Sequence, residues 1–247
     1  MSKSIVIFGF HSIQAQLQNN PECLLKVWKL DNRHDKRLNA LITQLDQLSI
    51  DTCAVDKQQL DKLTKNQSHQ GIAAQILPPA LPNQDALMEF VTKLKNPALI
   101  LILDSIQDPR NLGACLRSAN AAGADCVVIN KDSSAPINAL VHKTSAGALD
   151  NLKIFSVTNL ARTIKALKQE NIWVLGLDGT SKTAIYQIDL TTSSAIIMGS
   201  EGSGLRKLTK KSCDQLATIP MQGSVESLNV SVATGIALFE ANRQRLN

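Results

Sequence analysis

The apolar stretch Pro-Ala-Leu-Ile-Leu-Ile-Leu at residues 97–103 decides the fold, because a run without polar side chains is typical of a strand buried on both faces. Similar runs recur further along the chain, at residues 126–129, 172–177, 195–198 and 216–219. Helical patterns separate them, most clearly at residues 159–169 and 228–245. Buried strands that alternate with helices predict an α/β domain with a parallel sheet covered by helices.

A second, smaller α/β pattern precedes this domain. Its expected strands lie at residues 5–8, 25–30, 52–55 and 72–76, and its expected helices at about 12–18 and 35–48. The stretch Leu-Pro-Pro-Ala-Leu-Pro-Asn-Gln at residues 77–84 then places three prolines within five positions, which fits neither a helix interior nor a central strand. We therefore predict a small N-terminal domain over residues 1–76, a linker and lead-in over 77–96, and the larger C-terminal domain over 97–247.

The overall charge permits an anionic partner without establishing one. The chain has 26 Lys and Arg residues against 21 Asp and Glu residues, which gives a net charge of +5 and an isoelectric point near 9.0. Aromatic residues make up only 3% of the chain, which argues against base-stacking platforms as the main means of binding nucleic acid. We therefore expect any RNA contact to rely on shape and polar groups.

The cysteines and histidines predict neither a metal site nor a disulfide framework. The five cysteines are widely spaced without a C-x-x-C pair, and the four histidines show no metal-ligand spacing. The first residues show no signal-peptide pattern, and no apolar stretch is long enough to cross a bilayer. We therefore expect a cytoplasmic protein with no membrane partner.

Polar residues and glycines gather just after three of the expected strands, where open parallel sheets bind their ligands. These segments lie at residues 104–117, 199–205 and 219–232. Each also has a structural interpretation, because the first and third contain helix-capping residues and the second contains glycines suited to tight turns. The glycine segment is not a P-loop, since Gly204 is followed by Leu205 and Arg206 rather than by a Lys-Ser or Lys-Thr pair. A nucleotide-binding enzyme is correspondingly disfavoured.

A basic run follows the glycine segment. Its sequence, Arg-Lys-Leu-Thr-Lys-Lys at residues 206–211, places Arg206 near Lys210 and Lys207 near Lys211 on one helix. Like charges four residues apart on a helix repel one another. The run is therefore either a solvated helix face or a surface that meets phosphate.

At the three segments, the sequence resembles the SpoU/TrmH branch of the knotted SPOUT RNA methyltransferases. The motifs of that branch, D-P-x-N-L-G-x-x-x-R, G-x-E-G-x-G and I-P-M-x-G-x-x-x-S-L-N-V-S, all occur here in order and in full. The resemblance covers residues 97–247. The N-terminal part resembles the L30e-type RNA-binding domain of bacterial 23S rRNA guanosine-2′-O-methyltransferases, through Gly-Phe-His-Ser-Ile at residues 9–13 and His-Gln-Gly-Ile at residues 69–72.

The resemblance implies a fold and an activity that composition does not show. The implied fold is an α/β protein with a deep trefoil knot in the C-terminal parallel-sheet domain and a small L30e-like α/β domain before it. The implied activity uses S-adenosylmethionine to methylate a ribose 2′-hydroxyl, most plausibly of a guanosine in 23S ribosomal RNA. The implied assembly is a homodimer, with no DNA partner. The alternatives are a tRNA ribose methyltransferase and a non-catalytic RNA-binding assembly factor.

The resemblance also assigns roles to particular residues. The family's catalytic and substrate-binding positions correspond to Asn111, Arg117, Glu201, Ser227 and Asn229. Its cofactor-binding positions correspond to Gly176, Gly199, Ile219, Met221 and Leu228.

We expect Arg117 to clamp a phosphate rather than to act as a base, because a guanidinium stays protonated. An RNA phosphate, Glu201 or water is then left to accept the proton of the hydroxyl. Glu226 departs from the family pattern, since relatives often carry a small or polar residue there.

Overall fold

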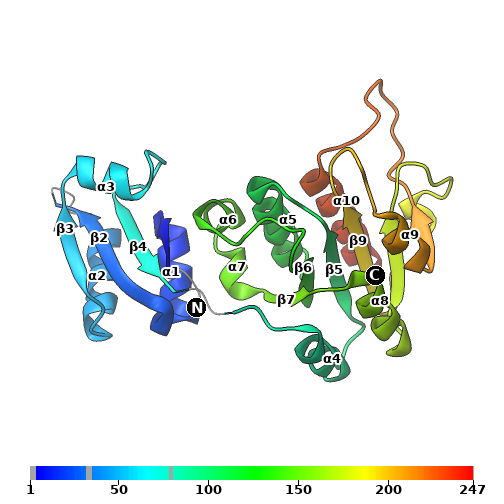
Figure 1. Cartoon of the computed structure of the whole chain (residues 1–247), viewed down its shortest axis with the longest axis horizontal. Coiled ribbons are helices and arrows are strands. Elements are labelled where there is room, and N and C mark those ends of the chain that lie inside the picture. Colours follow the sequence, from blue (N-terminus) through cyan, green and yellow to red (C-terminus); the bar gives the residue numbers. More distant parts are fainter. Residues whose placement is uncertain (1–3, 32–34, 78–79, 247) are drawn as a thin grey trace. The chain divides into compact units, whose positions relative to one another are not determined.

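A computed structural model describes residues 4–31, 35–77 and 80–246 of the chain. These residues form two compact units, whose elements are labelled in Figure 1. The first unit comprises Met1–Ala80 and Ile137–Asn151, and the second comprises Leu81–Pro136 and Leu152–Asn247. Both are α/β units, as the alternation of strand and helix patterns predicts.

The first unit is built on a mixed sheet of four strands in the order β1-β4-β2-β3. Its strands are β1 (Ile5–Phe8), β2 (Leu24–Leu30), β3 (Thr52–Val55) and β4 (Ile72–Ile76). The pairs β1–β4 and β4–β2 are antiparallel, whereas β2 and β3 are parallel. All four strands lie within a residue of the ranges that the sequence predicts.

Helices cover both faces of this sheet. Ile7 packs with α1 (Phe10–Asn19) and α2 (Lys36–Gln47) on one face, whereas its neighbour Phe8 packs with α3 (Lys57–Leu63) on the other. Successive side chains of a strand point to opposite faces, so this alternation gives each helical layer its own apolar contact. A short 3-10 helix, η1 (Pro21–Cys23), leads into β2.

A segment from the middle of the chain completes the first unit. It contains α6 (Ala139–Ser145) and α7 (Ala148–Asn151). The Ser12 hydroxyl donates to the backbone carbonyl of His142 at 3.3 Å, and the Asn19 side chain donates to Asn151 at 3.1 Å. The segment thus packs against α1, although the predicted boundaries assign it to the C-terminal domain.

The second unit is built on a parallel sheet of six strands in the order β10-β8-β9-β5-β6-β7. Its strands are β5 (Leu99–Asp104), β6 (Cys126–Asn130), β7 (Lys153–Val157), β8 (Trp173–Leu177), β9 (Ser194–Gly199) and β10 (Gln215–Ala217). Every residue of the central strand β5 is buried, as its apolar run predicts. The late strand β9 lies between β5 and β8, so that Asp104 and Gly199 are paired at the carboxyl end of the sheet.

Helices also cover both faces of the second sheet. Ile100 and Ile102 of β5 belong to a core that includes α4 (Gln84–Thr92) and α8 (Leu160–Gln169). α5 (Pro109–Ala121) and α10 (Val230–Arg245) pack against each other, with the Cys115 thiol 3.4 Å from the Thr234 hydroxyl. The remaining helical elements are α9 (Lys207–Ser212) and η2 (Ile185–Gln187).

The last turn of α10 is tied to the start of the sheet through Arg245. Its guanidinium donates to the backbone carbonyls of Pro97, Ala98, Leu190 and Thr192 and to the hydroxyl of Ser194, over 2.7–3.0 Å. Ala98, Leu190 and Ser194 are buried, so these bonds satisfy polar groups that water does not reach.

Several elements differ from the sequence-based predictions. The sequence patterns did not identify β7 or the helices α3, α4, α6 and α7, and α4 forms within the predicted lead-in. Ile219 lies beyond the end of β10, and α10 begins at Val230 rather than at residue 228. Pro78 and Pro79 of the predicted linker lie outside the described residues. Among the described residues, no helix is both long and apolar enough to cross a membrane.

Candidate functional site

A cavity of 1360 Å³ opens at the carboxyl ends of the neighbouring strands β10, β8 and β9. It lies wholly within the second unit, where a parallel sheet is expected to bind its ligand. The cavity is larger than the ~300–1000 Å³ of most small-molecule sites. It is lined by residues 177–180, 198–205, 218–221 and 226–230, together with Lys210 and Ala233.

The loop that follows β9 supplies the tightest part of the wall. The backbone groups of Ser200 and Gly204 donate to each other at 2.9 and 3.1 Å, and Gly202 and Gly204 adopt positive φ angles of 81° and 64°. A Cβ atom on Gly199 would lie only 2.2 Å from the carbonyl carbon of Gly204. The glycines therefore make a tight turn, and Gly199 also allows two backbone segments to approach more closely than a side chain permits.

Asp104 anchors the far end of the same loop. This carboxylate lies at the end of β5 and is fully buried. It accepts from the Nε atom of Arg206 at 2.6 Å, from the backbone amide of Arg206 at 3.1 Å and from the Ser105 hydroxyl at 3.1 Å. The loop is thus fixed at both ends, by strand β9 and by the ion pair of the exposed Arg206 with the buried Asp104.

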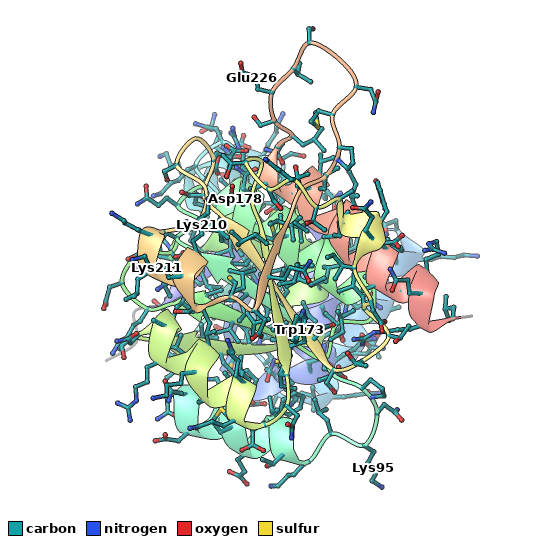
Figure 2. All side chains as sticks on the ribbon, turned by 90° about the vertical axis from the view of Figure 1, so that its right-hand side faces the viewer. Lys95, Trp173, Asp178, Lys210, Lys211 and Glu226 are labelled. Carbon is teal, nitrogen blue, oxygen red and sulfur yellow. The ribbon has the colours of Figure 1, made fainter. Side chains whose placement is uncertain are left out.

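The loop that follows β8 carries a second ion pair, between Asp178 and Lys210 at 2.7 Å. Both residues line the cavity, and Figure 2 labels them near each other. Asp178 also accepts from the backbone amide of Thr180 at 2.9 Å and from its hydroxyl at 2.5 Å. Burial alone would raise the pKa of Asp178, but the hydrogen bonds from Lys210 and Thr180 outweigh it and hold that pKa below its ordinary value.

A hydrogen-bonded cluster joins residues from all three predicted segments. The Asn229 side-chain amide donates to Asn111 at 3.0 Å and to Glu201 at 2.5 Å, although these partners lie 118 and 28 residues away in the chain. The Asn229 side-chain oxygen accepts from the Ser231 backbone amide at 3.0 Å. Asn229 therefore caps α10, as its residue type predicts, and holds the cluster with the same side chain.

Most of the predicted site residues meet at this cavity. Its lining includes Gly199, Glu201, Ile219, Met221, Ser227, Leu228 and Asn229. Asn111 is joined to them through Asn229.

Two predicted residues lie apart from the cavity wall. Gly176 lies within β8, where a Cβ atom would come within 2.8 Å of Leu205, Cys213 and Leu216, so close packing alone requires a glycine there. Arg117 is exposed on α5, about two turns after Asn111. Within the described part of the chain, its guanidinium makes no hydrogen bond or ion pair.

Sequence reasoning missed Asp178 and Thr180, which line the cavity beside Lys210. Asp178 directly follows the apolar strand β8, so the rule that directs attention to strand ends would have identified it. Glu226, the departure from the family pattern, lines the cavity from the long loop between β10 and α10. Figure 2 shows that loop projecting from the body of the second unit.

Comparison with known proteins agrees with this geometry. Residues 98–239 match the SpoU rRNA Methylase family, and residues 6–82 match a family described as RNA 2′-O ribose methyltransferase substrate binding. The chain is 48% identical over 242 residues to the 23S rRNA (guanosine-2′-O-)-methyltransferase RlmB of Haemophilus ducreyi, with 98% of each chain covered.

Solved structures share the fold along the whole chain. A crystal structure of an RNA 2′-O ribose methyltransferase is 26% identical with a TM-score of 0.80, over 100% of this chain and 90% of that one. The SpoU methyltransferase AviRb from Streptomyces viridochromogenes, in complex with the cofactor AdoMet, is 22% identical with a TM-score of 0.84, over 99% and 91% of the two chains. Because the matched residues 98–239 span more than half of the sequence and contain every loop that surrounds the cavity, the chain belongs to the SpoU rRNA methylase family.

Proposed function

We propose that this chain transfers a methyl group from S-adenosylmethionine to the ribose 2′-hydroxyl of a guanosine in 23S ribosomal RNA. One observation carries the proposal. Two motifs of the family line one cavity and Asn111 of the third is hydrogen-bonded to its wall, in a chain that matches a 23S rRNA guanosine methyltransferase over 98% of its length. Such a substrate places the activity in the bacterial cytoplasm.

The cavity wall suits a cofactor held mainly by backbone groups. Gly199 lets the backbone of Gly204 and Leu205 pack directly against it, and the backbone hydrogen bonds between Ser200 and Gly204 fix this turn beside the cavity. Gly199, Ile219, Met221 and Leu228 would hold the cofactor, while Gly176 supports the wall from within β8. When bound, S-adenosylmethionine supplies an electrophilic methyl group. A cavity of 1360 Å³ leaves room beside the cofactor for part of a nucleotide.

The polar cluster would position the ribose. Asn111 and Asn229 are held in one arrangement by their mutual hydrogen bond, so less ordering is needed when the substrate binds. Ser227 lines the same cavity and would contact the nucleotide next to them. These groups orient the 2′-oxygen, and orientation lowers the barrier without a strong base.

The 2′-hydroxyl must lose its proton as its oxygen accepts the methyl group. Glu201 Oε1 already accepts from the side-chain amide of Asn229 and from the backbone amide of Val230, so Oε2 is the atom left for a proton. A substrate phosphate and water are the other two acceptors. The Arg117 guanidinium is unpaired by other described side chains, which suits it to clamp an RNA phosphate with two parallel hydrogen bonds.

The first unit would bind RNA away from the reacting ribose. Residues 6–82 match the substrate-binding family, which supports an L30e-like RNA-binding role for the predicted domain over residues 1–76. The linker and lead-in over residues 77–96 would then connect it to a catalytic domain over residues 97–247. The match over residues 98–239 supports that division of labour.

A trefoil knot and a dimer complete the proposal. Family membership supports the knot, together with the insertion of the late strand β9 between β8 and β5. Val232 and Phe239 lie seven residues apart on α10 and are each 50% exposed, so one face of this helix presents apolar side chains that a second copy would bury. Light scattering at micromolar protein concentration should give twice the chain mass of 26.7 kDa, and a value near that mass would contradict the dimer.

Methylation of 23S rRNA is tested most directly in cells. Mass spectrometry of nuclease-digested ribosomal and transfer RNA should show one 2′-O-methylguanosine in 23S rRNA that disappears when the gene is deleted and returns when it is restored. Loss from transfer RNA instead would favour the tRNA methyltransferase. An unchanged methylation pattern, together with no transfer of radiolabelled methyl by the purified protein, would favour the assembly factor.

A further inference from the structure

Two neighbouring helices of the second unit carry only positive charge. α8 and α9 pack against each other, and neither contains an Asp or Glu residue. Their cationic residues are Arg162, Lys165, Lys168, Lys207, Lys210 and Lys211. Like-charged helices that pack together repel each other unless an anion lies near them.

Acidic neighbours neutralise only part of this charge. Lys168 pairs with Asp214 at 2.7 Å, and Lys210 pairs with Asp178 at 2.7 Å. The other carboxylate oxygen of Asp214 accepts from the backbone amide of Val174 at 2.9 Å. The two ion pairs thus attach α8 and α9 to residues that flank strands β10 and β8.

Four cations remain on the two helices without an acidic partner among the residues that the structure describes. They are Arg162, Lys165, Lys207 and Lys211. Lys207 and Lys211 lie four residues apart on α9, so their like charges repel each other. The basic run that the sequence singles out is therefore paired on one side of α9 and unpaired on the other.

Two of the unpaired lysines, Lys165 and Lys211, lie at a groove of 430 Å³ between the two helices, beside the paired Lys168. Lys165, Lys168 and Lys211 line it, together with Ala161, Gln169 and Ser212. α9 separates this groove from the candidate active site, because Lys210 lines the large cavity and the next residue, Lys211, lines the groove. Figure 2 shows both lysines on α9.

We infer that this groove binds the sugar-phosphate backbone of the substrate RNA next to the nucleotide that is methylated. The inference rests on the proposed function, since it extends the RNA path from the large cavity across α9. A helix is only ~10–12 Å wide, so an RNA backbone that leaves the large cavity reaches the groove by crossing α9 alone. Lysine ammonium groups attract phosphate as point charges without reading a base, which suits a surface that positions RNA but does not select its sequence.

The test compares two double variants that remove equal charge. Lys165→Ala with Lys211→Ala removes two unpaired cations from the groove. Lys95→Ala with Lys153→Ala is the control, because both residues are exposed and lie before β5 and at the start of β7, at the amino ends of their strands. Figure 2 shows Lys95 at the bottom of the view, away from Lys211 at its left edge. Binding of in-vitro-transcribed bacterial 23S rRNA is measured by filter retention from 50 to 300 mM KCl.

The groove variant should show a smaller salt dependence. Each lost lysine–phosphate contact lowers the slope of log Kd against log salt by about 0.7–0.9, so the double variant should lose about 1.5, with RNA affinity about tenfold weaker at 150 mM KCl. In methyl transfer, KM for RNA should rise by a similar factor while kcat stays constant. Affinity for S-adenosylmethionine, measured by calorimetry, should not change, which also shows that the variant is folded.

The outcomes separate this inference from the proposed function. Equal slopes and equal KM values for the two double variants would overturn the inference and leave the methyltransferase assignment intact. If only the groove variant lost slope, but the wild-type protein transferred no methyl group, the groove would stand and the methyltransferase assignment would be rejected. Absence of RNA binding by the wild-type protein would reject both.

Discussion

Replacement of Gly199 by alanine should damage cofactor binding more than any other single methyl group added to the chain. The new Cβ atom would lie 2.2 Å from the Gly204 carbonyl carbon and 2.4 Å from the Leu205 amide nitrogen, whereas ordinary contact begins at about 3.4 Å. The two backbone segments must therefore separate by about 1.2 Å, the gap between these values. The loop cannot absorb this movement easily, because the Arg206–Asp104 ion pair fixes its far end.

The magnitude follows from that displacement. Overpacking of this kind costs ~1–3 kcal/mol of stability, and a shift of about 1 Å in a positioning group costs about a hundredfold in rate. We expect Kd for S-adenosylmethionine to rise at least tenfold by isothermal titration calorimetry, and kcat/KM for radiolabelled methyl transfer to fall about a hundredfold.

A second glycine provides the matched control. In Gly235→Ala the nearest atom to the new Cβ is the Ser118 hydroxyl oxygen at 3.7 Å, which is ordinary contact. This variant should bind the cofactor as tightly as the wild-type protein, and it should be up to ~1 kcal/mol more stable because alanine favours a helix interior. If Gly199→Ala bound S-adenosylmethionine within threefold of the wild-type affinity, the loop after β9 would not hold the cofactor as we propose.

Three further variants test other parts of the molecule. Arg117→Ala should lower kcat at least a hundredfold in radiolabelled methyl transfer while calorimetry shows nearly unchanged cofactor affinity, and a large loss of that affinity would contradict the phosphate-clamp role. Arg245→Ala should lower the free energy of unfolding, measured in urea, by ~2–4 kcal/mol, because the buried Leu190 carbonyl loses its donor. Arg245→Lys should recover part of this free energy. A loss below ~0.5 kcal/mol in Arg245→Ala would refute the account. Burial lowers the pKa of His142 from 6.5 to about 4, so the unfolded chain binds a proton first and stability should fall by up to ~3 kcal/mol as the pH drops from 6.5 to 4. His142→Phe should lose less stability than the wild-type protein over this range. Burial raises the pKa of Asp150 to about 6, which contributes in the opposite direction, but this contribution is the same in both proteins and cancels in the comparison. Parallel curves of unfolding free energy against pH for the two proteins would contradict the prediction.

The sequence predicts the strands of both sheets better than it predicts the helices between them. Residues 99–103 of β5 are all apolar and buried, so composition alone identifies the strand. α6 and α7 contain only 7 and 4 residues, too few for a helical period to be visible. They are stabilised by contacts with the first unit, such as the bond from Ser12 to His142, 130 residues away. No local pattern contains that information.

Part of the candidate site could also be predicted from sequence, and part of it could not. Because ligands gather at the carboxyl ends of parallel strands, the loops after β5, β9 and β10 could be selected from sequence. Their order in the sheet could not, and that order brings Glu201 and Asn111 to the same amide of Asn229. The pairing of Lys210 with Asp178 was equally hidden, since it depends on the adjacency of β8 and β10. Residue types are thus readable from sequence, and their partners require the topology.

The Arg245 contacts also bear on the order in which the protein matures during translation. The guanidinium that satisfies the Ala98 carbonyl is made 147 residues after it, a delay of about 7–30 s at ribosomal speeds of ~5–20 residues per second. All residues of the first unit are synthesised before Arg245, whereas the residues at the beginning of β5 lack these hydrogen bonds until α10 has been made. The buried backbone carbonyl of Ala98, just before β5, is therefore among the last groups of the second unit to complete their hydrogen bonds during synthesis.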